Sequence, residues 1–166
     1  MVVVHRPLTS KRASRAVRVL ALGALVVPLA ACATTIGATP ADDAANPDCA
    51  PVMLALPDVL AGDLDKAKTN AQATAAWGEP GAAVTLRCGV TPPGPSPDCQ
   101  RVESAAGAVD WIVEAGNDGT WRFTTYGREP AVEVLVPPSV TEDHSTSFVG
   151  DLAQAVSNVP ATAECS

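Results

Sequence analysis

The sequence predicts an α+β domain, with an antiparallel sheet of about four strands, two or three helices packed on one side, and two disulfides. Three observations support this prediction. Strand-like runs of β-branched and aromatic residues, separated by turn residues, dominate the second half of the chain. Helical spacing of apolar residues is weaker and occurs before and after them. Four cysteines, an even number, lie in the region expected to fold, as is typical of small exported domains.

The predicted strands contain β-branched or aromatic residues, and they are residues 81–87, 109–115, 120–126 and 131–136. The second and third flank Gly116-Asn-Asp-Gly119, a strong hairpin signal. The fourth stops at a Pro-Pro pair. Within it the valines alternate with Glu133, so we expect one buried face and an outward-facing Glu133.

Three segments show helical features. In residues 64–76, leucine and alanine recur at helical spacing, which predicts the longest helix. Residues 52–56 are apolar and end before Pro57, which favours a single helical turn. Near the C-terminus, Ser145 or Ser147 is a candidate N-cap for a helix over residues 148–156.

The first 31 residues have the features of a secretory signal peptide. They are basic, no acidic residue precedes Asp42, and the apolar run at residues 19–29 is too short to cross ~30 Å of hydrocarbon. The run ends in Leu29-Ala-Ala-Cys32, which resembles the lipobox of bacterial lipoproteins, where the cysteine sulfur takes a diacylglycerol and cleavage occurs before it. We therefore expect Cys32 to be the lipidated first residue of a protein anchored at the extracytoplasmic face of the cell membrane. The alternative is an ordinary secretory signal with a chance cysteine.

Composition divides the remainder into two parts. Residues 32–47 are small and polar with no apolar period, which predicts a disordered tether, and residues 48–166 have the length of a single small domain. The whole chain has a net charge of −7, but after removal of residues 1–31 only 6 basic residues face 18 acidic ones, a net charge of −12. This balance excludes nucleic acid as a partner, because contacts with phosphate backbones need a basic surface.

The four cysteines after the anchor can pair in three ways, and they are Cys49, Cys88, Cys99 and Cys165. We favour Cys88–Cys99, which would close a short proline-rich loop, and Cys49–Cys165, which would tie the two ends of the domain together. A metal site would need Cys-x-x-Cys or clustered histidines, and the sequence has neither. We therefore expect structural disulfides and no metal.

Five motifs occur in order and together resemble a known family. They are Ala76-Trp-Gly-x-Pro80, Leu86-Arg-Cys-Gly-Val90, Val109-Asp-Trp111, Thr125-Tyr-Gly-Arg-x-Pro130 and Val134-x-Val-Pro137. The family is one of small actinobacterial lipoproteins catalogued as domain of unknown function 3515. The resemblance extends from Cys49 to Cys165. It implies an exported, usually lipid-anchored domain without an established biochemical activity.

The polar and aromatic residues of these motifs are the candidates for a ligand-binding site, namely Arg87, Asp110, Trp111, Tyr126 and Arg128. In one interpretation they gather in a pocket where two arginines hold a carboxylate or phosphate. In the other they are architectural, because the chain has few large aromatic residues to fill a core and Asp110 can pair with Arg87 or Arg128.

No catalytic motif such as Gly-x-Ser-x-Gly or Ser-x-x-Lys is present, and His144 is the only histidine after the signal peptide. We expect no enzymatic activity, no catalytic residue and no cofactor. The sequence favours a lipid-anchored envelope protein of unknown biochemical activity, acting as a non-catalytic interaction module that docks onto an envelope or cell-wall protein. The alternative is a binder of a small anionic envelope or cell-wall ligand through Arg87 and Arg128.

Overall fold

The computed structural model describes residues 34–166, so the predicted signal peptide and Cys32 lie outside the described residues. Its strands are β1 (Thr35–Ile36), β2 (Val59–Leu60), β3 (Leu64–Thr69), β4 (Thr74–Glu79), β5 (Ala82–Val90), β6 (Cys99–Ser104), β7 (Gly107–Ala115), β8 (Trp121–Thr125) and β9 (Ala131–Val136). The helical segments are α1 (Cys49–Leu54), α2 (Pro138–Thr141), the 3-10 helix η1 (Thr146–Leu152) and α3 (Ala153–Val156). None of the helices in this part of the chain is long and apolar enough to span a membrane.

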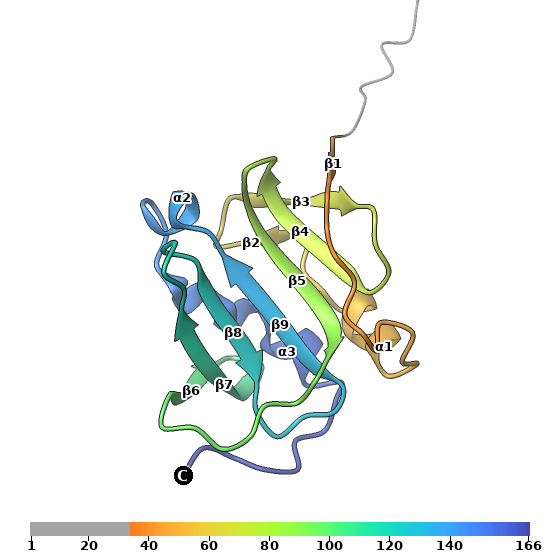
Figure 1. Ribbon diagram of the computed structural model, residues 1–166, viewed down its shortest axis with the longest axis vertical. Coiled ribbons are helices and arrows are strands. Elements are labelled where there is room, and N and C mark those ends of the chain that lie inside the picture. The colour runs from red at the N-terminus through yellow and green to blue at the C-terminus, as the bar shows by residue number, and fades with distance from the viewer. Residues whose placement is uncertain (1–33) are drawn as a thin grey trace, which may run out of the picture. The chain divides into compact units, whose positions relative to one another are not determined.

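The predicted fold class is wrong, because the domain is mostly β. Nine strands form one sheet in the order β1-β3-β4-β5-β9-β8-β7-β6, with β2 also paired to β3 (Figure 1). The sheet is mixed, since β1 runs parallel to β3 whereas the other pairs are antiparallel. The helical segments are short, so they cover part of the sheet without forming a helical layer.

The largest local error is the helix predicted over residues 64–76, which is the β3–β4 hairpin. Alanines at helical spacing do not distinguish a helix from a strand, because alanine fits either when its neighbours supply the packing. The turn is held locally, since the Thr74 hydroxyl donates to the Ala71 carbonyl at 2.7 Å. On the far side of the hairpin, the indole of Trp77 is fully buried and donates to the Pro57 carbonyl at 2.9 Å. Tertiary contacts of this kind override weak helical periodicity.

The hairpin predicted around residues 116–119 is confirmed as the β7–β8 turn. Gly116 donates its N–H to the Thr120 carbonyl at 2.8 Å, and Gly119 has a positive φ of 83°. The predicted strands 81–87 and 131–136 correspond to β5 and β9. Strand β6, which had no expected counterpart, pairs with β7 at the edge of the sheet.

The core lies between one face of the sheet and the segments α1, η1 and α3. Its largest buried side chains come from alternating positions of the central strands, among them Trp77, Leu86, Trp111 and Val134, and from Leu152. The rings of Trp111 and Phe123 meet edge to face with centroids 6.3 Å apart.

Glu133 points to the opposite face of β9 from the buried valines, but it is not exposed as predicted. Its side chain is only 7% exposed, because it lies between two arginines. Arg87 Nε lies 2.7 Å from Glu133 Oε1, and Arg122 Nε lies 3.4 Å from Oε2. Paired cations allow a carboxylate to occupy a position where an isolated charge would be costly.

The prediction of a disordered tether over residues 32–47 is wrong from residue 34 onward. Ile36 is buried and pairs with Thr69 of β3, and the Ala38 N–H donates to Asn70 Oδ1 at 2.8 Å. Further along, the Asp43 N–H donates to the Gly89 carbonyl at 3.1 Å. Gly89 has a φ of 97°, and a Cβ there would lie 2.3 Å from the Asp43 carbonyl oxygen. The segment is therefore part of the folded domain, because its backbone is hydrogen-bonded despite its low hydrophobicity.

Two disulfides are present, but the predicted pairing is wrong. Cys49 joins Cys88 with a Cα–Cα distance of 5.7 Å, and Cys99 joins Cys165 at 5.6 Å. The reason is sheet order. Cys88 is on β5 and Cys99 on β6, and strands β9, β8 and β7 lie between these two in the sheet. Cys88 and Cys99 are close in the sequence, separated mainly by the proline loop (residues 91–98), but they lie far apart in the sheet.

Candidate functional site

The structure brings together three of the five predicted ligand-binding residues. Asp110, Tyr126 and Arg128 line a single hollow at the end of the sheet where β8 stops. Arg87 lies elsewhere, on the polar face of β5, and Trp111 lies in the core.

Trp111 has a structural role. Its side chain is fully buried against Phe123, and its indole N–H has no hydrogen-bond acceptor among residues 34–166. The side chain therefore cannot reach a ligand at the surface, and its contribution is to fill the core.

Arg87 lines a groove of about 360 Å³ with Thr74, Thr85 and the segment from Gly37 to Thr39. Its guanidinium is held by Glu133 through the 2.7 Å contact, and its side chain is 32% exposed. Arg128 lines a different hollow that shares no residue with this groove. Arg87 and Arg128 are therefore not placed to bind one small anionic ligand together.

Asp110 is the centre of a hydrogen-bonded cluster. Its Oδ1 accepts from Arg101 Nε at 2.8 Å, and its Oδ2 accepts from Arg101 Nη2 at 3.0 Å and from the Cys165 N–H at 2.9 Å. These donors hold the pKa of Asp110 below its usual value, with the Arg101 hydrogen bonds as the main cause. Arg101 was not predicted as a site residue. It faces Asp110 across the β6–β7 ladder, so recognising β6 as a strand would have placed it there.

Arg128 is 8% exposed and donates from Nη1 to the Val159 carbonyl. Its Nε–H is buried and has no acceptor within residues 34–166. Burial lowers the pKa of Arg128, and the nearby Asp110 carboxylate opposes that effect. The guanidinium thus joins the loop after β8 to the segment that follows α3, which is an architectural task.

The last residues of the chain are fastened across this end of the sheet. The Thr162 N–H donates to the Gly127 carbonyl at 2.7 Å, and Glu164 Oε2 lies 2.9 Å from Arg101 Nη2. Gly127 has a φ of 70°, and a Cβ there would lie 2.1 Å from the Ala163 carbonyl oxygen. Together with the Cys99–Cys165 disulfide, these contacts fix the C-terminal tail, residues 159–166, in one position.

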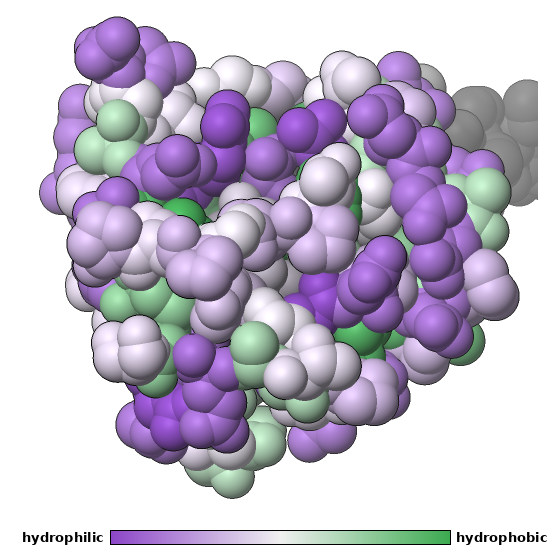
Figure 2. Space-filling view, turned by 60° about the horizontal axis from the view of Figure 1, so that its bottom comes forward, coloured by the Kyte–Doolittle hydropathy of each residue, from purple (hydrophilic) through white to green (hydrophobic). Residues whose placement is uncertain are grey.

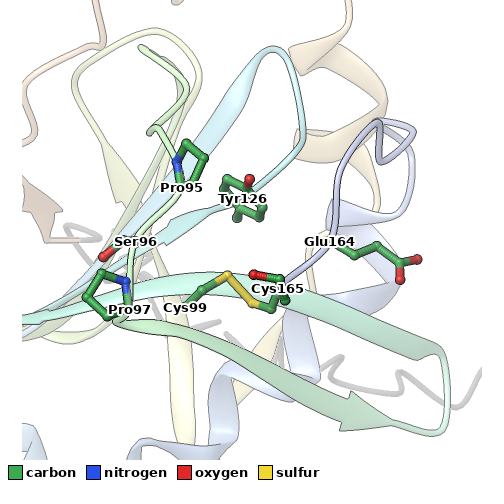
Figure 3. A pocket seen from close by; sticks show the side chains of 8 residues that line it. Pro95, Ser96, Pro97, Cys99, Tyr126, Glu164 and Cys165 are labelled. Atoms are coloured by element: carbon green, nitrogen blue, oxygen red, sulfur yellow. A yellow bond between two sulfur atoms is a disulfide. The ribbon is translucent and has the colours of Figure 1, made fainter.

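The tail and the proline loop form the walls of an open cleft, which we call the Tyr126 cleft. It consists of a hollow of about 310 Å³ and the adjoining hollow of about 160 Å³ that contains Arg128, and the two share Tyr126 and Glu164. The larger hollow is lined by Pro95, Ser96, Pro97, Cys99, Tyr126, Glu164, Cys165 and Ser166. Figure 3 shows the Tyr126 ring and the disulfide facing this hollow, with the proline rings on one side and Glu164 on the other.

The Tyr126 cleft offers an aromatic ring, proline rings and carboxylates rather than a catalytic pair. Tyr126 is half-buried, so its ring is rigid yet accessible. On the face seen in Figure 2, which brings this end of the molecule forward, hydrophobic residues appear only as small separate areas among polar ones. Such a surface suits a modest, partly polar contact rather than an obligate hydrophobic interface.

His144, the only histidine of the described residues, is not part of this cleft. Its Nε2 lies 2.8 Å from Asp63 Oδ1, and this hydrogen bond raises the pKa of His144. Across residues 34–166 no group of three or more histidine, cysteine or acidic side chains is placed to hold a metal ion.

The chain belongs to the family described as "Protein of unknown function (DUF3515)", whose model matches residues 13–164. No curated protein and no solved structure gives a significant match to it. The family membership agrees with the ordered motifs at residues 76–137 and assigns no chemistry to the Tyr126 cleft.

Proposed function

We propose that this member of the DUF3515 family is a lipid-anchored protein of the extracytoplasmic envelope. Its folded domain serves as a non-catalytic interaction module, and the Tyr126 cleft is the surface that docks onto an envelope or cell-wall protein. The observation on which this proposal rests is the rigid, partly exposed tyrosine at the end of the domain away from β1.

Export is supported by the cysteine chemistry and by the N-terminal sequence. Two disulfides persist in oxidising compartments and are rare in reducing ones. The basic and apolar N-terminal segment and the lipobox-like Leu29-Ala-Ala-Cys32 are the features of a lipoprotein signal. An acyl-anchored product needs two chains for stable attachment, and diacylglycerol supplies two.

Docking at the Tyr126 cleft is supported by composition and by rigidity. Tyr126 is the only tyrosine of the chain, and tyrosine is enriched where protein interfaces carry most of their binding energy. The walls of the cleft are fixed by the disulfide, by Arg101–Asp110 and by Arg101–Glu164. Fixed walls lower the entropic cost of association, because less of the surface has to be ordered on binding. A shallow open hollow fits a partner side chain better than an enclosed small molecule.

The position of the cleft also suits docking away from the membrane. Strand β1, near the start of the described residues, begins at the top of Figure 1, whereas β8 ends and the chain terminates at the bottom. A domain anchored near β1 therefore presents the Tyr126 cleft toward the periplasmic or wall side.

The experiment is site-specific photocrosslinking in the native envelope. A photoreactive phenylalanine analogue replaces Tyr126 in one variant and Trp121 in the control. Trp121 is a suitable control because it is an aromatic residue 38% exposed at the opposite end of β8. We expect a discrete protein adduct from the Tyr126 variant and not from the Trp121 variant, identified by mass spectrometry. Identical adduct patterns from the two positions, or no adduct at Tyr126, would reject docking at the cleft.

A further inference from the structure

The folded domain begins very close to the proposed anchor. Only Ala33 separates Cys32 from Thr34, and β1 starts at Thr35. Two residues span about 7 Å at most, so a lipid on Cys32 would hold Thr34 within about 7 Å of the anchored cysteine. Ile36 is buried and paired to β3, which prevents the start of the domain from serving as a longer linker.

The cationic side chains of the domain fall into two groups, arginines that are paired or buried and lysines that are exposed. Residues 34–166 contain six of them, four arginines and two lysines. Three arginines contact carboxylates, and the fourth, Arg128, is buried against a backbone carbonyl. Lys66 and Lys68 are exposed, and neither forms an ion pair with any of the described residues.

Both lysines lie beside the start of the domain. They alternate along β3 and therefore project from the same face of the strand. Lys68 is the register partner of Thr35, and both lysines line the same shallow hollow as Thr34 and Ile36. We define the β1–β3 edge as Thr34, Ile36, Lys66 and Lys68.

We propose that the β1–β3 edge is the membrane-facing surface of the domain, where Lys66 and Lys68 bind the phosphates of anionic phospholipids in the leaflet that holds the anchor. This inference rests on the proposed lipidation of Cys32. The short anchor brings the edge to the headgroups, and the long lysine side chains extend the charge toward the phosphates. Asp65 and Glu79 also line this hollow, whereas most of the 18 acidic residues lie elsewhere and are repelled by the same leaflet. One lysine near an anionic surface favours binding about 5-fold, so two isolated lysines would favour this orientation roughly 25-fold, and repulsion of Asp65 and Glu79 in the same hollow reduces that factor.

Amine labelling tests this orientation, because the sequence after Cys32 contains only these two lysines. The full lipidated protein is compared in nonionic detergent, in vesicles of phosphatidylglycerol and phosphatidylcholine, and in vesicles of phosphatidylcholine alone. A membrane-impermeant amine reagent is added, and the labelling rate at Lys66 and Lys68 is measured by peptide mass spectrometry. The reference is a variant carrying Gln100→Lys, an exposed position in β6 next to the Tyr126 cleft. Rates are expressed relative to this reference lysine, which cancels differences in accessible protein.

We expect the relative rate at Lys66 and Lys68 to fall severalfold from detergent to anionic vesicles, and less in phosphatidylcholine alone. An insertion of about 20 glycine and serine residues after Ala33 should restore labelling, since such a linker reaches about 25 Å. Unchanged relative rates in anionic vesicles that carry the protein would overturn the membrane-facing edge while leaving the anchor intact. Equal protection in both kinds of vesicle would overturn the binding of lipid phosphates by the lysines. Failure of the protein to float with vesicles would instead reject the anchor, and this inference with it.

Discussion

The carboxylate of Asp110 holds the C-terminal tail in place, and replacing it with the isosteric amide tests that role. Asp110 is 6% exposed, and both of its oxygens face only donors. Oδ1 faces Arg101 Nε, and Oδ2 faces Arg101 Nη2 and the Cys165 N–H. In Asp110→Asn the amide NH2 must oppose a donor in either orientation, so the substitution loses charge and at least one hydrogen bond.

The expected magnitude follows from these contacts. Hydrogen bonds to a charged group contribute ~1.5–3 kcal/mol, and a buried donor left without an acceptor adds a penalty. The Arg101 side chain is 41% exposed and regains water, which limits the cost. We therefore expect Asp110→Asn to lower the free energy of unfolding by about 2–3 kcal/mol. At roughly 4 °C per kcal/mol for a domain of this size, the melting temperature should fall by about 8–12 °C.

The assay is thermal and urea unfolding with both disulfides intact, and the matched control is Asp118→Asn. Asp118 is exposed in the β7–β8 turn and accepts one backbone hydrogen bond from Thr120 at 3.0 Å. We expect the control to lose much less stability than Asp110→Asn, because the Asp118 side chain is exposed to solvent. A loss at Asp110 no larger than the loss at Asp118 would refute the role of this carboxylate.

The same substitution predicts a pH dependence. Because the pKa of Asp110 is lower in the folded protein than in the unfolded chain, its stabilisation is fully present above the unfolded pKa of about 3.9. It is lost as the pH falls through the folded pKa, when the carboxylate takes up a proton. The stability difference between the native protein and Asp110→Asn should therefore narrow below about pH 4. A difference that stays constant from pH 7 to pH 3 would contradict the assignment.

The other predictions concern the remaining fixed points of the fold. Peptide mapping without reduction should recover Cys49 with Cys88 and Cys99 with Cys165. Gly127→Ala should destabilise by more than about 2 kcal/mol and expose the C-terminal tail to proteolysis, because the new Cβ meets Ala163. Gly94→Ala, where nothing lies within 4 Å, should match the native protein in both assays. Arg128→Lys should lower the melting temperature by several degrees more than Arg87→Lys, since lysine cannot reproduce the buried planar contact with Val159, and equal shifts would argue against this difference.

Local signals predicted the parts of the fold that depend on local chemistry. The β7–β8 hairpin follows from Gly116-Asn-Asp-Gly119, because few sequences satisfy a tight turn between alternating strands. Strands β5 and β9 follow from apolar residues at alternating positions, since period-two burial has no helical equivalent. Neither signal depends on knowing which strands are neighbours.

The errors in the predicted fold arise where contacts between residues distant in the sequence determine the structure. Residues 64–76 contain alanines that fit the spacing of either a helix or a strand. The hairpin is favoured by the burial of Trp77 and its hydrogen bond to the Pro57 carbonyl. The tether prediction failed for a related reason. Residues 34–47 bury little side chain, but their backbone is fixed by β3 and by the close approach to Gly89. Composition measures hydrophobicity and does not report such backbone pairing.

In the candidate site too, residues within local motifs were predicted, whereas partners from distant segments were missed. Asp110, Tyr126 and Arg128 were predicted as site residues, and they do meet in one hollow. Their partners Arg101 and Glu164 were missed, because they join the cluster only through β6 and the fixed tail. The predicted joint role of Arg87 and Arg128 failed because the two arginines line separate hollows.

The disulfide pairing connects the proposed location of the protein with its proposed docking surface. The walls of the Tyr126 cleft are a proline loop and the C-terminal tail, and neither has regular secondary structure to hold it. Cys99–Cys165 joins the end of one wall to the end of the other, whereas Cys49–Cys88 joins α1 to β5 and touches neither. Loss of the first bond therefore removes the covalent link between the two walls, while the central strands and the second bond keep the core folded. The Cys99–Cys165 bond persists where cysteines stay oxidised, so, if the protein is exported as proposed, the cleft would gain this covalent support only after export.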